Sequence, residues 1–79
     1  MKVNVLFFGA TADAVGKRAV ELDVAGESKS RAVFELVLAE HPSLESHKLL
    51  FALNQEYATG TETLKENDEL ALFTAVSGG

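Results

Sequence analysis

Four carboxylates lie close together in this sequence and are the first candidates for chemistry. They are Glu62, Glu66, Asp68 and Glu69. A calcium or magnesium site needs oxygen ligands that converge in a fixed geometry, and the spacing of these side chains resembles no calcium loop. We therefore predict that this acidic run is solvated and faces a partner, and we expect no metal site.

Histidine, thiol and phosphate-binding chemistry have little support in the sequence. His41 and His47 flank the segment that begins with Pro42, and neither can be placed beside a serine or carboxylate, which favours a surface or capping role. The segment from Gly9 to Gly16 lacks the Gly-Lys-Ser/Thr ending of a phosphate-binding loop. The chain has no cysteine. The sequence therefore predicts no self-contained active site.

The remaining candidate is the carboxylate of Gly79, which follows Ser77 and Gly78. A carboxylate becomes a good electrophile once it is activated, for example as an acyl-adenylate, and it can then accept sulfide or a thiol. Glycines have no Cβ, so these two can pass through a channel too narrow for other residues. The β-branched Thr74 and Val76 would hold the preceding strand extended. The alternative is that this segment is only a flexible end.

The elements that must position this end are predicted from the spacing of apolar residues. A helical spacing from residue 31 to residue 40 predicts one amphipathic helix, capped by Ser28 or Ser30 and ended by Pro42. Residues 9–17 form a connection with a short helical turn. Segments rich in β-formers predict strands at 2–8, 18–24, 49–54, 55–58 and 69–76.

This order of elements predicts an α+β fold in two layers, with one main helix covering one face of a mixed sheet. A hairpin, a crossing helix and a last strand beside the first describe the β-grasp, or ubiquitin-like, arrangement. Other two-layer topologies remain open from the pattern alone. We predict a single domain over residues 1–79, with a tail at 77–79.

With a single helix, the outer face of the sheet should be solvated and polar, but three apolar side chains are predicted to lie on it. Alternation along the first and last strands places Leu6, Phe8 and Phe73 on the face away from the helix. An exposed apolar patch of this kind indicates a partner. The alternatives are that one strand is turned the other way or that a loop covers the patch.

Charge and composition exclude some classes of function. The 79 residues carry a formal net charge of −5, and the 7 Lys and Arg residues are scattered. Nucleic-acid binding needs clustered cations, so we expect none. An acidic surface either serves solubility or complements a basic partner. The apolar run in residues 1–10 is too short for a signal peptide or a membrane span, so we expect a cytoplasmic protein without a membrane partner.

Four pieces of the chain carry a resemblance to a known family. They are "KVNVLFFG", "LAEHP", "ALNQEYA" and "LKENDELALFTAVSGG". The sequence resembles the MoaD family, the ubiquitin-like sulfur carriers that form the small subunit of molybdopterin synthase. The family usually has prolines where Thr74 and Ala75 stand here, and an apolar residue is commoner at the position of Ser30.

The resemblance implies a function for the end of the chain. An E1-like adenylating enzyme, similar to MoeB, would use ATP to adenylate Gly79, and a sulfur donor protein would convert it to a thiocarboxylate. Gly78 and Gly79 would enter the large subunit, MoaE, which holds cyclic pyranopterin monophosphate. Sulfur from Gly79 would build the dithiolene of molybdopterin within a heterotetramer. The chain would be no enzyme by itself and would keep no permanent cofactor.

The resemblance also implies a partner-binding surface, and it leaves two alternatives open. The family's apolar contact positions correspond to Phe8 and Phe73. The full predicted contact set is Leu6, Phe8, Phe73, Val76 and Ser77. A carrier for thiamine or tRNA thiolation would share the Gly-Gly ending. A ubiquitin-like modifier would instead be joined through Gly79 to protein lysines.

Overall fold

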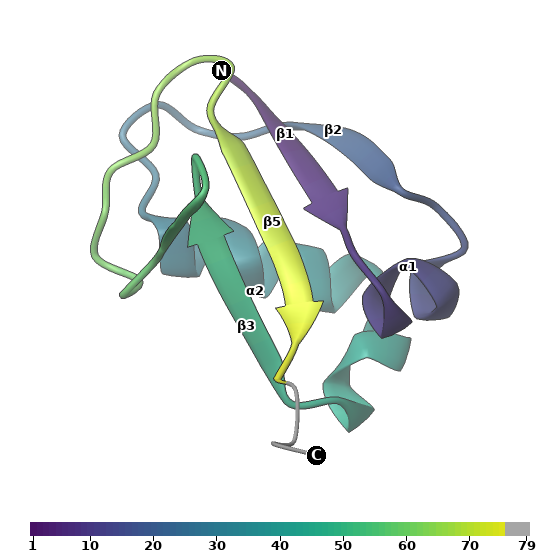
Figure 1. The fold of residues 1–79 in the computed structure, drawn as a ribbon. Coiled ribbons are helices and arrows are strands. Elements are labelled where there is room, and N and C mark those ends of the chain that lie inside the picture. Colours follow the sequence, from purple (N-terminus) through teal and green to yellow (C-terminus); the bar gives the residue numbers. More distant parts are fainter. Residues whose placement is uncertain (76–79) are drawn as a thin grey trace.

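A mixed sheet of five strands forms the centre of the computed structural model, which describes residues 1–75 (Figure 1). The strand order is β2-β1-β5-β3-β4. The strands are β1 Lys2–Phe7, β2 Ala19–Asp23, β3 Leu49–Leu53, β4 Glu56–Tyr57 and β5 Glu69–Thr74. β1 and β5 run parallel, and every other neighbouring pair is antiparallel. The first and last strands are therefore neighbours, as the order of elements predicted.

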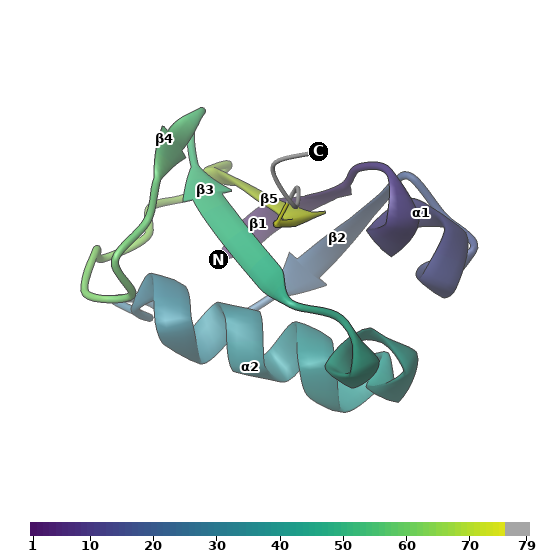
Figure 2. The same ribbon diagram turned by 60° about the horizontal axis from the view of Figure 1, so that its bottom comes forward.

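Helical segments cover one face and one end of this sheet (Figure 2). They are α1 Ala10–Val15, α2 Ser30–Glu40 and the 3₁₀ helix η1 Pro42–Ser46. α2 crosses one face, and α1 packs against η1. α2 ends before Pro42, as predicted, because the proline ring disfavours helical geometry at His41, which has φ −129° and ψ 73°. Within residues 1–75 the opposite face of the sheet has no helix over it.

The start of α2 differs from the prediction. The N-cap residue is Lys29, and neither Ser28 nor Ser30 caps the helix with its side chain. The backbone N–H groups of residues 30 and 31 instead donate to the carbonyl oxygens of Glu62 and Gly60, at 2.8 and 3.2 Å. A loop distant in sequence thus accepts hydrogen bonds from N–H groups that have no partner within the helix. The sequence next to the helix start does not reveal this loop.

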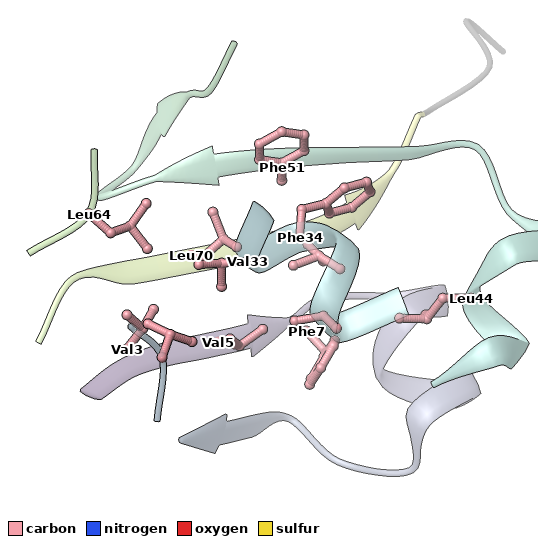
Figure 3. Close-up of a cluster of buried hydrophobic side chains, with 12 residues drawn as sticks. Val3, Val5, Phe7, Val33, Phe34, Leu44, Phe51, Leu64 and Leu70 are labelled. Atoms are coloured by element: carbon pink, nitrogen blue, oxygen red, sulfur yellow. The ribbon is translucent and has the colours of Figure 1, made fainter. Parts of the chain in front are cut away.

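The core lies between α2 and the sheet (Figure 3). Its side chains from β1 and β5 are Val3, Val5, Phe7, Leu70 and Leu72, all buried. The ring of Phe34 on α2 stacks on the ring of Phe51 on β3, with 4.5 Å between centroids. Burial of each such side chain stabilises the fold by about 1.5–3 kcal/mol. The core therefore determines which face of each strand is left outside.

The predicted fold class is confirmed, with small differences at the ends of elements. β1 ends one residue early, at Phe7, because Gly9 turns the chain into α1 with φ 57° and ψ −128°. β5 is described to its end at Thr74, and Val76 lies outside the described residues. No helix in residues 1–75 is both long enough and apolar enough to span a membrane.

Candidate docking face

An apolar patch lies on the outer face of the sheet, near the end where β1 and β5 finish. Because Val5 and Phe7 point into the core, Leu6 points outward. Its register neighbours are Ala19 on β2 and Ala71 on β5. Beside these small neighbours the Leu6 side chain is half-buried.

Phe8 and Phe73 lie on the same face as Leu6, as alternation predicted. Phe8 is 52% exposed, and Phe73 is half-buried. The structure thus favours the exposed patch over a reversed strand, because the alternate residues of β1 and β5, such as Phe7 and Leu72, are buried in the core. The role of these three side chains in binding a partner stays a prediction.

The patch also includes two large side chains that the sequence analysis did not identify. Leu50 on β3 lies opposite Phe73 in the register and is 40% exposed. The ring of Tyr57 on β4 lies 5.8 Å from the ring of Phe73 and is 76% exposed. We call Leu6, Phe8, Leu50, Tyr57 and Phe73 the docking face. Alternation within β3 places Leu50 opposite in direction to the buried Phe51, and this signal could have identified it.

The remaining predicted site residues lie outside the described part of the chain. They are Val76, Ser77, Gly78 and Gly79. The described chain reaches Ala75, whose N–H donates to the carbonyl oxygen of Lys48 at 3.1 Å. The described chain therefore ends two residues after Phe73, the residue that β5 contributes to the docking face.

Thr11 holds the carboxyl ends of β1 and β5 together beside this face. Its side chain is fully buried, and its hydroxyl Oγ1 accepts from the N–H of Phe8 at 2.9 Å. The same hydroxyl lies 2.7 Å from the Phe8 carbonyl oxygen and 3.0 Å from the Leu72 carbonyl oxygen, so it can donate to either. Two backbone groups of Phe8, directly after β1, and one of Leu72 on β5 thus share one hydroxyl.

The acidic run has a structural role that the prediction of a solvated partner surface missed. Glu62 Oε1 accepts from Ser30 Oγ at 2.6 Å and from the N–H of Gly60 at 3.0 Å. Glu62 Oε2 accepts from the N–H and the hydroxyl of Thr59, at 2.8 and 3.0 Å. The bond from Ser30, followed by that from the Thr59 N–H, lowers the pKa of Glu62 to about 2. The spacing of Thr59 and Glu62 is that of a capping box, the signal which could have found this carboxylate.

Two further carboxylates of the run also bind the chain itself. Glu66 accepts from the backbone N–H of Lys2. Asp68 accepts from the N–H of Lys65 at 2.8 Å and from the side-chain amide of Asn54 at 3.1 Å. Glu66 is exposed and Glu62 and Asp68 are partly exposed, so these carboxylates reach solvent as predicted. They also bind donors of the chain itself, which the sequence prediction did not include.

The two histidines pack against other parts of the fold. The ring of His41 packs edge-on against the ring of Phe7, with 5.8 Å between centroids, and His47 is half-buried after η1. Within the described residues, no three His, Cys, Asp or Glu side chains come together in a way that could hold a metal ion. The docking face is thus the feature of the described chain best suited to function.

A comparison with known families agrees with this geometry. The ThiS family matches residues 5–79, a range that includes β5 and the Gly-Gly pair at 78–79. This chain belongs to the ThiS family. A relative, the molybdopterin synthase sulfur carrier subunit of Chlamydomonas reinhardtii, is 31% identical over 83 residues, covering 100% of both chains. The small archaeal modifier protein 1 of Haloferax volcanii is 33% identical over 82 residues, covering 91% of this chain and 94% of the relative.

Solved structures show the same fold as this member of the ThiS family. The crystal structure of SAMP1 from Haloferax volcanii superposes with a TM-score of 0.88 at 30% identity, covering both chains completely. A chain from the complex of subunits 1 and 2 of molybdopterin-converting factor from Helicobacter pylori superposes with a TM-score of 0.71 at 23% identity, again over both whole chains. The ubiquitin-like β-grasp fold and the resemblance to molybdopterin synthase sulfur carriers are confirmed.

Proposed function

We propose that this chain is the sulfur carrier subunit of a molybdopterin synthase. An E1-like adenylating enzyme uses ATP to convert the carboxylate of Gly79 into an acyl-adenylate, with pyrophosphate as the leaving group. Sulfur at the sulfide level, supplied by a sulfur donor protein, then attacks the acyl carbon, forms the C–S bond and displaces AMP, which leaves a thiocarboxylate. The thiocarboxylate gives its sulfur to cyclic pyranopterin monophosphate in the large subunit, and two such transfers complete the dithiolene of molybdopterin.

The observation that carries this proposal is the full-length match to a sulfur carrier subunit of that name. The family match also extends through residues 78–79, which is where the proposed chemistry occurs. The Helicobacter pylori complex supports a large-subunit partner, because a chain of this fold is paired there with a second subunit.

The docking face supports the same proposal on physical grounds. A partner that covers Phe8, Leu50 and Phe73 lies beside the end of β5, close to Ala75. Exposed aromatic and aliphatic side chains are the usual anchors of such interfaces. Binding there would bring Gly79 to the partner without using any residue of the core.

Charge explains why a large subunit is needed for the transfer itself. A thiocarboxylate and a phosphate-bearing substrate are both anionic, so their approach needs cations to offset the repulsion. This chain has a formal net charge of −5. We therefore place the cationic residues of the reaction in the partner, and the carrier supplies position and the sulfur atom.

Sulfur loading tests this proposal directly. The chain is incubated with ATP, an E1-like adenylating enzyme and a sulfur donor, and its intact mass is measured. We expect a mass gain equal to the replacement of one oxygen by one sulfur. Deletion of Gly79 should abolish this gain and leave thermal unfolding unchanged, because the core side chains lie between Val3 and Leu72. A large shift in thermal unfolding would instead make that residue structural.

The second candidate function is a protein modifier, favoured by the likeness to the Haloferax volcanii modifier protein. A modifier would form an amide between the Gly79 carbonyl and a lysine Nζ, with loss of AMP from the adenylate. The same loading reaction separates the two functions. If the products are protein conjugates and the sulfur-bearing mass never appears, the carrier proposal is wrong.

A further inference from the structure

We propose that the free edge of β2 binds an extended segment of another protein in which basic and apolar residues alternate. β2 is the outermost strand on its side of the sheet, and Figure 1 shows no other segment of the described chain along its outer edge. An edge strand can accept a further strand through its main-chain groups. Binding at this edge is separate from the proposed sulfur transfer, because it involves neither Gly79 nor the docking face.

The backbone groups that point out from this edge follow from the hydrogen bonds on the other side of β2. Met1 and Val24 exchange two hydrogen bonds, each of 2.8 Å. In an antiparallel pair, residues that bond across the pair alternate with residues that do not, so the even-numbered residues of β2 bond to β1. The odd-numbered residues direct their N–H and C=O groups away from β1. These residues are Ala19, Glu21 and Asp23.

The outer side of this edge is acidic. Glu21 Oε1 lies 3.3 Å from Lys2 Nζ, and Asp23 Oδ1 lies 3.6 Å from the N-terminal amino group. The two acidic side chains are still 57% and 81% exposed, so these ion pairs are weak and both carboxylates can meet a further cation. In an added strand, the side chains opposite Glu21 and Asp23 would lie within about 5.5 Å of them. Lysine or arginine is therefore favoured at these positions of the added strand.

The inner side of the same edge is apolar and incompletely covered. Val20 and Leu22 share the inner face of the sheet with Val5 and Val3, their register neighbours on β1. Val3 and Val5 are fully buried, whereas Val20 and Leu22 are only half-buried. An added strand would cover these two side chains further if its residues beside them were apolar. The two sides of the edge together favour a segment in which apolar and basic residues alternate.

Charge also determines that the added strand comes from a different protein. A second copy paired through β2 would bring Glu21 and Asp23 close to the same acidic side chains of its partner, and like charges at such positions are destabilising. The formal net charge of −5 further opposes self-association and attracts a basic partner. The occupant is therefore an extended segment of another protein, with lysine or arginine at every second residue and apolar residues between them.

A short synthetic peptide of alternating lysine and valine tests this edge. It is titrated into the ¹⁵N-labelled chain, and the amide signals and their hydrogen exchange are followed. We expect saturable shifts along β2 and slower exchange at Glu21 and Asp23, whose N–H groups gain acceptors. A peptide of alternating glutamate and valine is the control and should not bind. The proposal is overturned if the lysine peptide gives no saturable shifts, if both peptides bind alike, or if higher protein concentration alone slows exchange at Glu21 and Asp23, which would indicate a second copy.

Variants separate the charge of the edge from its backbone. Glu21→Lys keeps the N–H and reverses the charge, and it should weaken binding of the lysine peptide by roughly tenfold or more. Glu35→Lys is the matched control, because Glu35 is exposed on α2 and forms no ion pair within residues 1–75. Equal weakening by both variants would show attraction by net charge alone and overturn the proposal.

Glu21→Pro removes an N–H that points away from β1, and it should also weaken binding of the lysine peptide. Chemical denaturation checks that this variant is folded. Undiminished binding by folded Glu21→Pro would contradict main-chain pairing at this edge. If proline prevents folding, the two lysine variants decide the result. No step of these experiments uses sulfur or a large subunit, so their outcome is independent of the proposed function.

Discussion

Thr11 has one hydroxyl group, and three backbone groups, two of Phe8 and one of Leu72, lie within hydrogen-bonding distance of it. In sequence it is one small polar residue in a connection, with no sign of its role. Full burial makes its hydroxyl important, because a buried polar group left without a partner costs free energy. The residue therefore contributes to the position of Phe8 and to the stability of the whole fold.

Thr11→Val tests this role, because valine keeps the shape of threonine and removes the hydroxyl. We expect the free energy of unfolding to fall by about 1–3 kcal/mol, measured by chemical denaturation. Thr11→Ser keeps the hydroxyl and should lose less. If Thr11→Val and Thr11→Ser were equally destabilised, packing of the methyl group rather than the hydrogen bonds would explain the burial.

At the scale of elements, the loop from Thr59 to Leu64 fastens the start of α2. Gly60 has φ 103°, which other residues rarely adopt, and a Cβ at this position would lie 3.0 Å from Arg31 Nε, so a larger residue would strain this approach of the loop to the helix. The Glu62 carboxylate then collects donors from the loop and from Ser30. The helix start thus depends on a loop that follows it by many residues.

Glu62→Gln should destabilise the protein near neutral pH, because a neutral amide cannot replace a carboxylate that accepts several hydrogen bonds. The folded-state pKa of about 2 lies below the ordinary value of 4.5. The charged carboxylate therefore stabilises the fold above about pH 4.5, and this contribution is lost as the pH falls toward 2. Denaturation curves at several pH values should show the difference between the two proteins shrinking in acid. A difference independent of pH would contradict the role given to the charge.

At the scale of the whole molecule, the inner side of the sheet packs into the core, and the outer side presents the residues of the docking face. Phe51 and Phe73 show the contrast between the two. Phe51 is buried against Phe34, whereas Phe73 is half-buried and touches the surface ring of Tyr57. The two phenylalanines should therefore differ in what their removal costs.

Phe73→Ala should weaken binding of the large subunit by roughly tenfold or more and lower the free energy of unfolding by only about 1 kcal/mol. Phe51→Ala is the core control, with an expected loss of about 3–5 kcal/mol. Calorimetry and chemical denaturation measure the two quantities. If Phe73→Ala were as unstable as Phe51→Ala, Phe73 would belong to the core and the docking face would be smaller than we infer.

Much of this architecture could be predicted from local spacing alone. The alternation of Val3, Val5 and Phe7 and the helical spacing of Val33 and Val37 follow from the geometry of strands and helices. These periods are properties of a few neighbouring residues, so the sequence by itself determined the strands, the main helix, the fold class and the outward direction of Leu6, Phe8 and Phe73.

Other features were decided only by the tertiary structure. Ser30 and Glu62 meet across 32 residues of sequence, and Thr11 reaches Leu72 across 61. Leu50 and Tyr57 enter the docking face because β3 lies beside β5. Such contacts depend on the order and register of the strands, which no local period of the sequence contains.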